Sequence, residues 1–292
     1  MFYPPPQPLP PPPPAEEVPP APPGPAAPLP RYALATGITV FVILSQYFVP
    51  QNFPALRGLY ASTLADFLIV YGIPVASFLL LVGTRPLRHA VTRTGTGLVE
   101  GFRWYGLLTI LALFLSILAL SVILTIDPSA ANALAKPTPI VRAAQADPWL
   151  WVALSFVVGI VEETIFRGFI FGYWLVRSPR DWKIHAAWTS VLFASVHVYY
   201  ALTYGIVFVL PAIVLILDGA AFAIGFRDAG GNLVGVSFLH GWNDATAFLV
   251  LALPALGLTL HYLVVLIGVV IALIVYLRHR DRRAAENVLR PI

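Results

Sequence analysis

Two adjacent glutamates, Glu162 and Glu163, lie in an apolar segment, residues 149–176, whose only other charge is Arg167. The segment is longer than the roughly 20 residues that cross a bilayer. A charge near the bilayer centre costs at least about 2.5 kcal/mol on insertion scales, so such residues usually have a function. Buried carboxylates can serve as acid–base catalysts, as metal ligands or as proton relays.

The two glutamates are expected to have different roles because of helical spacing. Residues four apart share a face of an α-helix, so Glu163 meets Arg167 in an ion pair. Glu162 is rotated by about 100° from Glu163 and points elsewhere. We therefore expect Glu163 to be neutralised within its own helix and Glu162 to remain available as a base.

Two further pairs have the same spacing in other apolar segments: F-x-x-x-H ending at His197, and H-x-x-x-D from His240 to Asp244. At a rise of 1.5 Å per residue, Glu162 and His197 both lie roughly 20 Å from the cytoplasmic ends of their helices, and His240 lies at roughly 12–20 Å. Three helices are therefore expected to bring these side chains to a common depth.

Such a set can activate water in two ways. Glu162, His197, His240 and Asp244 are ordinary ligands for a divalent metal, zinc first, which lowers the pKa of its bound water. Alternatively, Glu162 deprotonates water directly while the imidazoles and an Asn amide or protonated Asp stabilise an oxyanion. A single buried His is more often a helix–helix contact, but the whole set favours a catalytic site.

The composition is that of a polytopic membrane protein. The 292 residues are 58% hydrophobic and 11% charged, with a mean hydropathy of +0.80, whereas average soluble domains carry about 25% charged residues. The absence of cysteine excludes disulfides and thiolate metal sites. The formal charge of +4 is concentrated in loops, so it reports membrane orientation, and no nucleic-acid partner is expected.

Hydropathy predicts an all-α bundle of about eight transmembrane helices. If both termini are cytoplasmic, 14 of the 18 lysines and arginines face the cytoplasm, as the positive-inside rule requires. With an odd number of helices, the basic loops would lie on both sides of the membrane and the bias would be lost. The predicted helices are 33–50, 59–83, 104–126, 149–176, 183–201, 203–226, 232–253 and 258–277.

The chain is expected to have three parts. Residues 1–30 contain sixteen prolines and are expected to be disordered or in polyproline II. This segment is either a ligand for a proline-recognising partner or a solvated spacer, and we favour the spacer. Residues 31–277 form the transmembrane domain, with its motif core at 149–253. Residues 278–292 form a basic cytoplasmic tail.

Four other polar residues in the apolar segments are of less interest. His185 and His261 lie near the ends of their segments, where a polar group costs little, and are expected to be structural. Asp66 and Asp218 lie deeper but lack a polar partner at helical spacing. Each is more readily explained by helix packing or by pairing with an arginine than by a place in the active site.

The three motifs resemble those of the CPBP intramembrane proteases, also called the Abi family, which include the type II CAAX prenyl proteases and bacteriocin-processing enzymes. Their order, spacing and placement in separate apolar segments all agree. The resemblance covers about residues 149–253. It is carried by E-E-x-x-x-R (Glu162, Glu163, Arg167), F-x-x-x-H (Phe193, His197) and H-x-x-x-Asx (His240, Asp244).

The resemblance implies a membrane-embedded endopeptidase of the metallo or glutamate type. Glu162 would activate the water and Glu163 would be held by Arg167. His197, His240 and Asp244 would bind the water or metal and steady the oxyanion. The partners would be the bilayer and a membrane-associated protein or peptide substrate, in a bacterial plasma membrane.

One residue departs from a common form of the third motif. The family also uses Asn at the position of Asp244, and Asn243 lies one residue earlier. An Asp would add negative charge beside Glu162 and favour a metal or a shared proton.

Two other functions remain open. A proton- or ion-coupled transporter would use Glu162, Asp66 and Asp218 as relay sites. No internal repeat supports that alternative. A catalytically silent scaffold of the same fold would retain the motifs without cleaving a substrate.

Overall fold

The computed structural model describes residues 27–61, 63–134, 137 and 139–288, and these residues form helices and loops without a strand. The predicted all-α class is confirmed. The α-helices are α1 (Leu29–Asn52), α2 (Arg57–Ala61), α3 (Thr63–Phe67), α4 (Ile73–Leu81), α5 (Thr94–Ile126), α6 (Ala131–Leu134), α7 (Pro139–Ala146), α8 (Pro148–Glu163), α9 (Gly172–Arg177), α10 (Trp182–Ser195), α11 (Tyr199–Tyr204), α12 (Val209–Asp228), α13 (Val234–Ala252) and α14 (Pro254–Val288).

Short helices of other types link these elements. Two π-helical segments continue one α-helix into the next: η2 (Leu68–Gly72) joins α3 to α4, and η5 (Thr164–Phe171) joins α8 to α9. The 3₁₀ turns are η1 (Pro54–Leu56), η3 (Arg85–Leu87), η4 (Pro128–Ala130), η6 (Pro179–Asp181) and η7 (Gly205–Phe208).

The membrane-spanning character is concentrated in long apolar helices. Within the described residues, six stretches are long and apolar enough to cross a bilayer: Leu29–Asn52, Leu64–Leu81, Thr94–Ile126, Pro148–Arg177, Gly205–Asp228 and Pro254–Arg280. The other two predicted spans are helical but differ from these. Helix α10 has only 14 residues, and α13 carries three polar side chains, His240, Asn243 and Asp244, near its middle. The count of eight and the cytoplasmic termini stay predictions.

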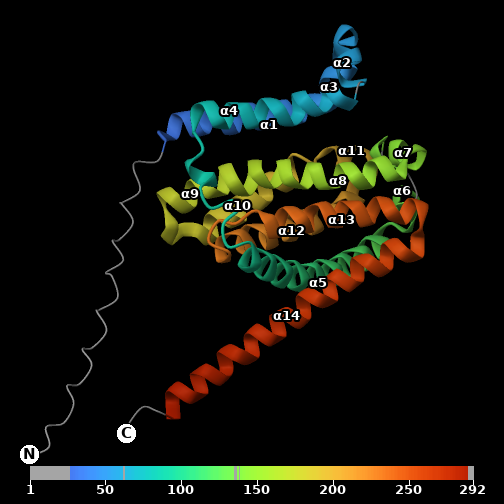
Figure 1. Cartoon of the computed structure of the whole chain (residues 1–292). Helices are drawn as coiled ribbons and strands as arrows, with labels where there is room; N and C mark the ends of the chain where they lie inside the picture. The colour runs from blue at the N-terminus through green and yellow to red at the C-terminus, as the bar shows by residue number, and fades with distance from the viewer. Residues whose placement is uncertain (1–26, 62, 135–136, 138, 289–292) are drawn as a thin grey trace, which may run out of the picture.

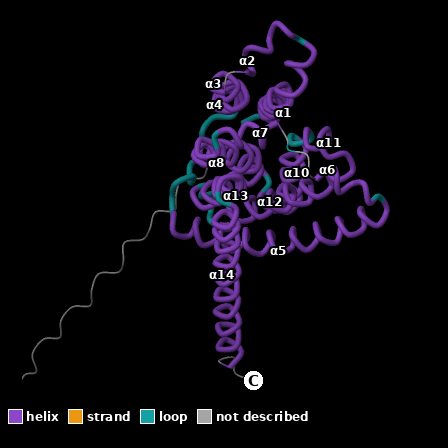
Figure 2. Tube along the Cα trace, turned by 90° about the vertical axis from the view of Figure 1, so that its right-hand side faces the viewer, coloured by secondary structure: helices purple, strands orange, loops and turns teal. Residues whose placement is uncertain are grey.

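The helices form a bundle with a helical pair on one side (Figure 1). In that pair, α1 packs along α4. Helix α8 packs chiefly on α13, α12 on both α5 and α10, and α14 on α5. The C-terminal part of α14 extends beyond the bundle, as both views show (Figure 2). The bundle therefore places the two motif helices α8 and α13 directly against each other.

Several predicted boundaries need correction. Helix α5 begins at Thr94 instead of 104, and α14 continues to Val288, so the predicted basic tail is helical over its described part. The predicted helix 183–201 is wrong as a single element, because α10 ends at Ser195 and a turn follows. Hydropathy marks the apolar part of a helix, whereas backbone hydrogen bonds decide where it ends. Most of the predicted disordered segment 1–30 lies outside the described residues.

Small residues allow α8 and α13 to approach closely. A Cβ atom added at Gly159 would lie 2.6 Å from the backbone nitrogen of Gly241, and one at Gly241 would lie 2.8 Å from Cα of Phe156. Membrane helices gain much of their packing energy from such close backbone contact. The Gly159–Gly241 contact lies one turn or less from Glu162 and His240, so it sets the distance across which the motif residues meet.

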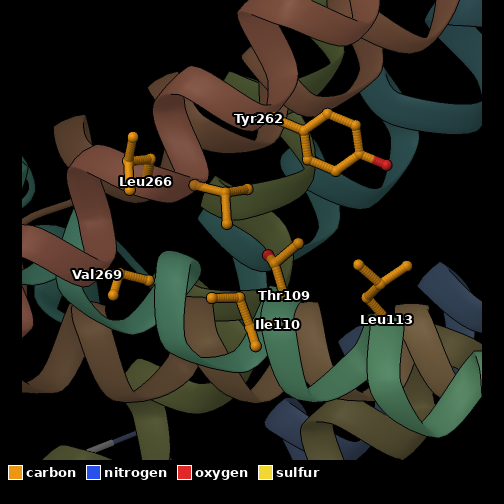
Figure 3. A pocket seen from close by; sticks show the side chains of 7 residues that line it. Thr109, Ile110, Leu113, Tyr262, Leu266 and Val269 are labelled. Carbon is orange, nitrogen blue, oxygen red and sulfur yellow. The ribbon is translucent and has the colours of Figure 1, made fainter.

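An apolar groove lies between α5 and α14, on the side of the bundle opposite the pair α1 and α4 (Figure 1). Its volume is about 210 Å³, and Figure 3 shows its side chains facing one another from the two helices. The groove contains none of the predicted site residues, and its composition is that of a surface facing lipid chains. The residues labelled there are Thr109, Ile110, Leu113, Tyr262, Leu266 and Val269.

Candidate functional site

The ion pair predicted within the first motif is present. Nη1 of Arg167 donates to Oε1 of Glu163 over 2.9 Å, and the two side chains are only 2% and 0% exposed. Nη2 of the same guanidinium donates to the carbonyl oxygen of Gly219 over 3.1 Å. The guanidinium carbon also lies 4.5 Å from the ring centre of Phe193, a cation–π contact. Arg167 thus connects η5 to α12 through Gly219 and to α10 through Phe193.

The helix that carries these residues has a defined start and an unusual middle. Asp147 caps α8 by accepting from the backbone N–H of Leu150, with Pro148 in the first turn. Directly after Glu163 the chain becomes π-helical over η5, which includes Arg167. π-Helical turns often occur at functional sites because they re-aim side chains.

His240 lies between the two adjacent glutamates. Its Nδ1 is 2.7 Å from Oε1 of Glu163, and its Nε2 is 3.7 Å from Oε2 of Glu162. Because an ionised carboxylate only accepts, Nδ1 donates its proton to Glu163. The ring is stacked on Phe222, with the ring centres 5.5 Å apart. Glu163, the partner of Arg167, therefore also fixes the orientation of His240, which the sequence did not indicate.

Asp244 completes the polar group around this imidazole. Its Oδ2 lies 3.5 Å from Nε2 of His240. Asn243 supports this group from beside it: its Oδ1 accepts from the hydroxyl of Tyr105 over 2.9 Å, and its side chain hydrogen-bonds to Asp244. Asp244, not Asn243, thus occupies the third-motif position at His240. With 33% of its side chain exposed, against 10% for Glu162, Asp244 marks the more open side of the group.

Glu162 has a partner that the motifs did not predict. The hydroxyl of Tyr71, in η2, donates to Oε1 of Glu162 over 2.7 Å. Its other oxygen, Oε2, faces His240. A tyrosine in an apolar segment carries no spacing signal of its own, so only the packing of η2 near α8 reveals this contact.

His197 reaches the group from the turn after α10. Its Nδ1 donates to the carbonyl oxygen of Phe193 over 2.8 Å, so the F-x-x-x-H motif is joined by a side chain–backbone bond. His197 interacts electrostatically with Asp244, on the open side of the group. It therefore joins the site from a turn and not from within a helix.

Of the remaining polar residues, only Asp218 lies at the site. It is 5% exposed and interacts electrostatically with His240 and Arg167. His185 stacks on Trp174, with ring centres 4.4 Å apart, and His261 contacts the hydroxyl of Thr246 over 3.5 Å. Asp66 lies on α3, in the first half of the second apolar segment. The expected structural role of the two histidines agrees with these contacts.

The residues predicted as metal ligands have suitable chemistry. Both imidazoles donate Nδ1–H to protein acceptors, as metal-binding histidines usually do. However, no group of three or more His, Asp or Glu side chains in the described part of the chain is arranged to hold an ion. A divalent metal at this site stays a prediction, and the chelator experiment below tests it.

Comparison with known proteins gives a family for this region. Residues 144–283 match the family model described as Rce1-like, type II CAAX prenyl endopeptidase Rce1-like. No curated protein and no solved structure matches the chain. The resemblance predicted from the three motifs is confirmed, and at the level of the family the match supports an intramembrane protease. The apolar helices likewise support a multi-pass membrane protein. No comparison supports the proline-recognising partner, and most of its segment, residues 1–26, lies outside the described residues.

Proposed function

On the premise of this match to Rce1-like prenyl endopeptidases, we propose that the protein is an intramembrane endopeptidase whose water is activated by Glu162. The observation that carries the proposal is the convergence of two carboxylates on one imidazole nitrogen within an apolar bundle. Oε2 of Glu162 and Oδ2 of Asp244 lie 3.7 and 3.5 Å from Nε2 of His240. Atoms at these separations are close enough for one water oxygen, at about 2.8 Å from each, to bridge either pair.

The reaction begins with the transfer of a water proton to Oε2 of Glu162. The water oxygen attacks the carbonyl carbon of the scissile peptide, and the carbonyl oxygen becomes an oxyanion. When the C–N bond breaks, Glu162 returns the proton to the leaving amine. General base catalysis of this kind contributes about 10²–10⁴-fold to the rate.

The other motif residues hold this arrangement. Glu163 accepts the Nδ1 proton of His240 and so directs Nε2 towards the water. Arg167 neutralises Glu163, which prevents two uncompensated carboxylates from lying side by side. His197, which interacts electrostatically with Asp244 on the open side, would stabilise the oxyanion.

The substrate class follows from the setting of the site and from the family. Glu162 lies in a stretch that is long and apolar enough to cross a bilayer, so the substrate is a polypeptide with a membrane-associated segment. The matched family is described by prenyl CAAX substrates. A prenylated C-terminal CAAX peptide is therefore one test substrate, and a hydrophobic leader peptide is the other.

The experiment compares purified wild type with Glu162→Ala on both peptides in detergent, with and without chelator. A matched control is Glu100→Ala, which removes a glutamate from α5 that pairs with Arg103 away from the site. Cleavage by wild type and the control, but not by Glu162→Ala, is the expected result. Loss of wild-type cleavage with chelator would show that the reaction also requires a metal. Equal cleavage by all three would overturn the role of Glu162, and proton uptake into liposomes without proteolysis would favour the transporter.

A further inference from the structure

We infer that Tyr71 is a positioning residue of the active site, which holds Glu162 so that Oε2 takes the proton from water. This inference rests on the proposed function and deepens it. Tyr71 lies outside the segment 144–283 that matches the family and outside the three motifs. Its contact with the base therefore adds a fourth element, η2, to the site.

The hydrogen bond assigns different roles to the two oxygens of the carboxylate. Oε1 of Glu162 accepts the Tyr71 hydroxyl over 2.7 Å, within the usual range for a strong bond to a carboxylate. Oε2 faces Nε2 of His240 over 3.7 Å. A base with one oxygen fixed presents the other in a single direction, and misplacement of a reacting group by about 1 Å can cost about 10²-fold in rate.

The position of Tyr71 depends on local structure that hydropathy does not reveal. The chain is π-helical from Leu68 to Gly72, and Pro74 follows in the first turn of α4. The wider turn changes the direction in which Tyr71 points relative to a regular α-helix. The ring is supported by Phe67, with ring centres 5.0 Å apart. Helix α4 in turn packs on η5, directly after the glutamate pair.

A consequence concerns the N-terminal helices. Helix α1 packs along α4, and the hydroxyl of Tyr32 on α1 donates to the carbonyl oxygen of Ile170 in η5. The first two apolar segments thus contact the motif helix through Tyr32 and Tyr71, and Phe78 of α4 also stacks on Phe169 of η5. We expect them to belong to the catalytic unit and not to serve only as anchors.

The test uses the full-length protein and the variants Tyr71→Phe and Tyr60→Phe. Tyr60→Phe is the matched control because it removes a tyrosine hydroxyl that contacts Ser45 over 2.9 Å, in the same N-terminal region but away from the site. We expect Tyr71→Phe to lower kcat about 10–100-fold with KM unchanged, because the base is misdirected and substrate binding is not. The control should keep wild-type kcat. An unchanged kcat in Tyr71→Phe overturns the inference.

A second measurement does not depend on activity. The Tm values of Tyr71→Phe, Glu162→Ala and the double variant form a cycle for the contact itself. If Tyr71 bonds to Glu162, the double variant should lower Tm by less than the sum of the two single substitutions, because either one alone already removes the bond. Strictly additive shifts overturn the inference even if wild type cleaves peptides. A non-additive cycle supports the contact, and if wild type nevertheless cleaves neither peptide, it is the proposed function that fails.

Discussion

The buried pair of Arg167 and Glu163 gives a prediction that does not require a known substrate. Replacing one partner of a buried ion pair strands the other charge, which costs about 3–5 kcal/mol. The pair here is 2% and 0% exposed, so Arg167→Met should destabilise the protein by about that amount. Loss of the bond from Arg167 to the Gly219 carbonyl adds to the cost. The substitution also strands the carboxylate that orients His240.

Removing both charges should restore part of the loss. In Arg167→Met with Glu163→Gln, no charge is stranded, and the amide oxygen can still accept from Nδ1 of His240. We expect the double variant to be more stable than Arg167→Met alone by about 2 kcal/mol or more. Equilibrium unfolding in mixed detergent micelles measures each free energy.

A partly exposed arginine provides the control. Arg103 contacts Glu100 and Asp228 with 17% of its side chain exposed, so Arg103→Met should cost less than Arg167→Met, whose side chain is 2% exposed. A similar cost for Arg103→Met and Arg167→Met would contradict the importance given to burial. So would a double variant that is less stable than Arg167→Met alone, because the stranded charge would then not be the source of the loss.

Three other substitutions test the packing and chemistry of the site. Asp244→Asn should keep kcat/KM within about tenfold, since an amide oxygen can replace Oδ2, and a loss beyond about 10³-fold would contradict this. His240→Ala should lower kcat by about 10²-fold or more without loss of expression, because Nε2 no longer orients the water; an unchanged kcat would exclude that role. Gly159→Val should lower the free energy of unfolding by about 1–3 kcal/mol, and with it Tm, because the new side chain meets the backbone of Gly241. An unchanged Tm would contradict the close approach.

Local spacing on a helix predicted much of the first motif. Glu163 and Arg167 meet because four residues make about one helical turn, and this holds although Arg167 lies in a π-helical segment. The depth estimate also brought Glu162 and His240 to the same level, where their atoms lie 3.7 Å apart. These features can be predicted from a sequence, because they depend either on spacing within one helix or on depth measured from the membrane surface.

Contacts between helices with no shared spacing were not predictable in this way. Nothing near Tyr71 distinguishes it from other tyrosines in apolar segments, and its bond to Glu162 depends on how η2 packs near α8. The contact of Glu163 with His240 was missed because the two glutamates were expected to point in separate directions. They instead approach the two nitrogens of one imidazole. The prediction of a single helix 183–201 likewise missed the turn that carries His197, because the apolar residues continue through that turn.

The central claim is that Glu162 activates the water that cleaves the peptide bond. The most direct measurement is the single-turnover rate of peptide cleavage by Glu162→Gln, which keeps the size of the side chain and an acceptor for the Tyr71 hydroxyl. We predict a rate lower than that of wild type by about 10²–10⁴-fold, with substrate binding and Tm retained. A Glu162→Gln rate equal to that of wild type would contradict the claim.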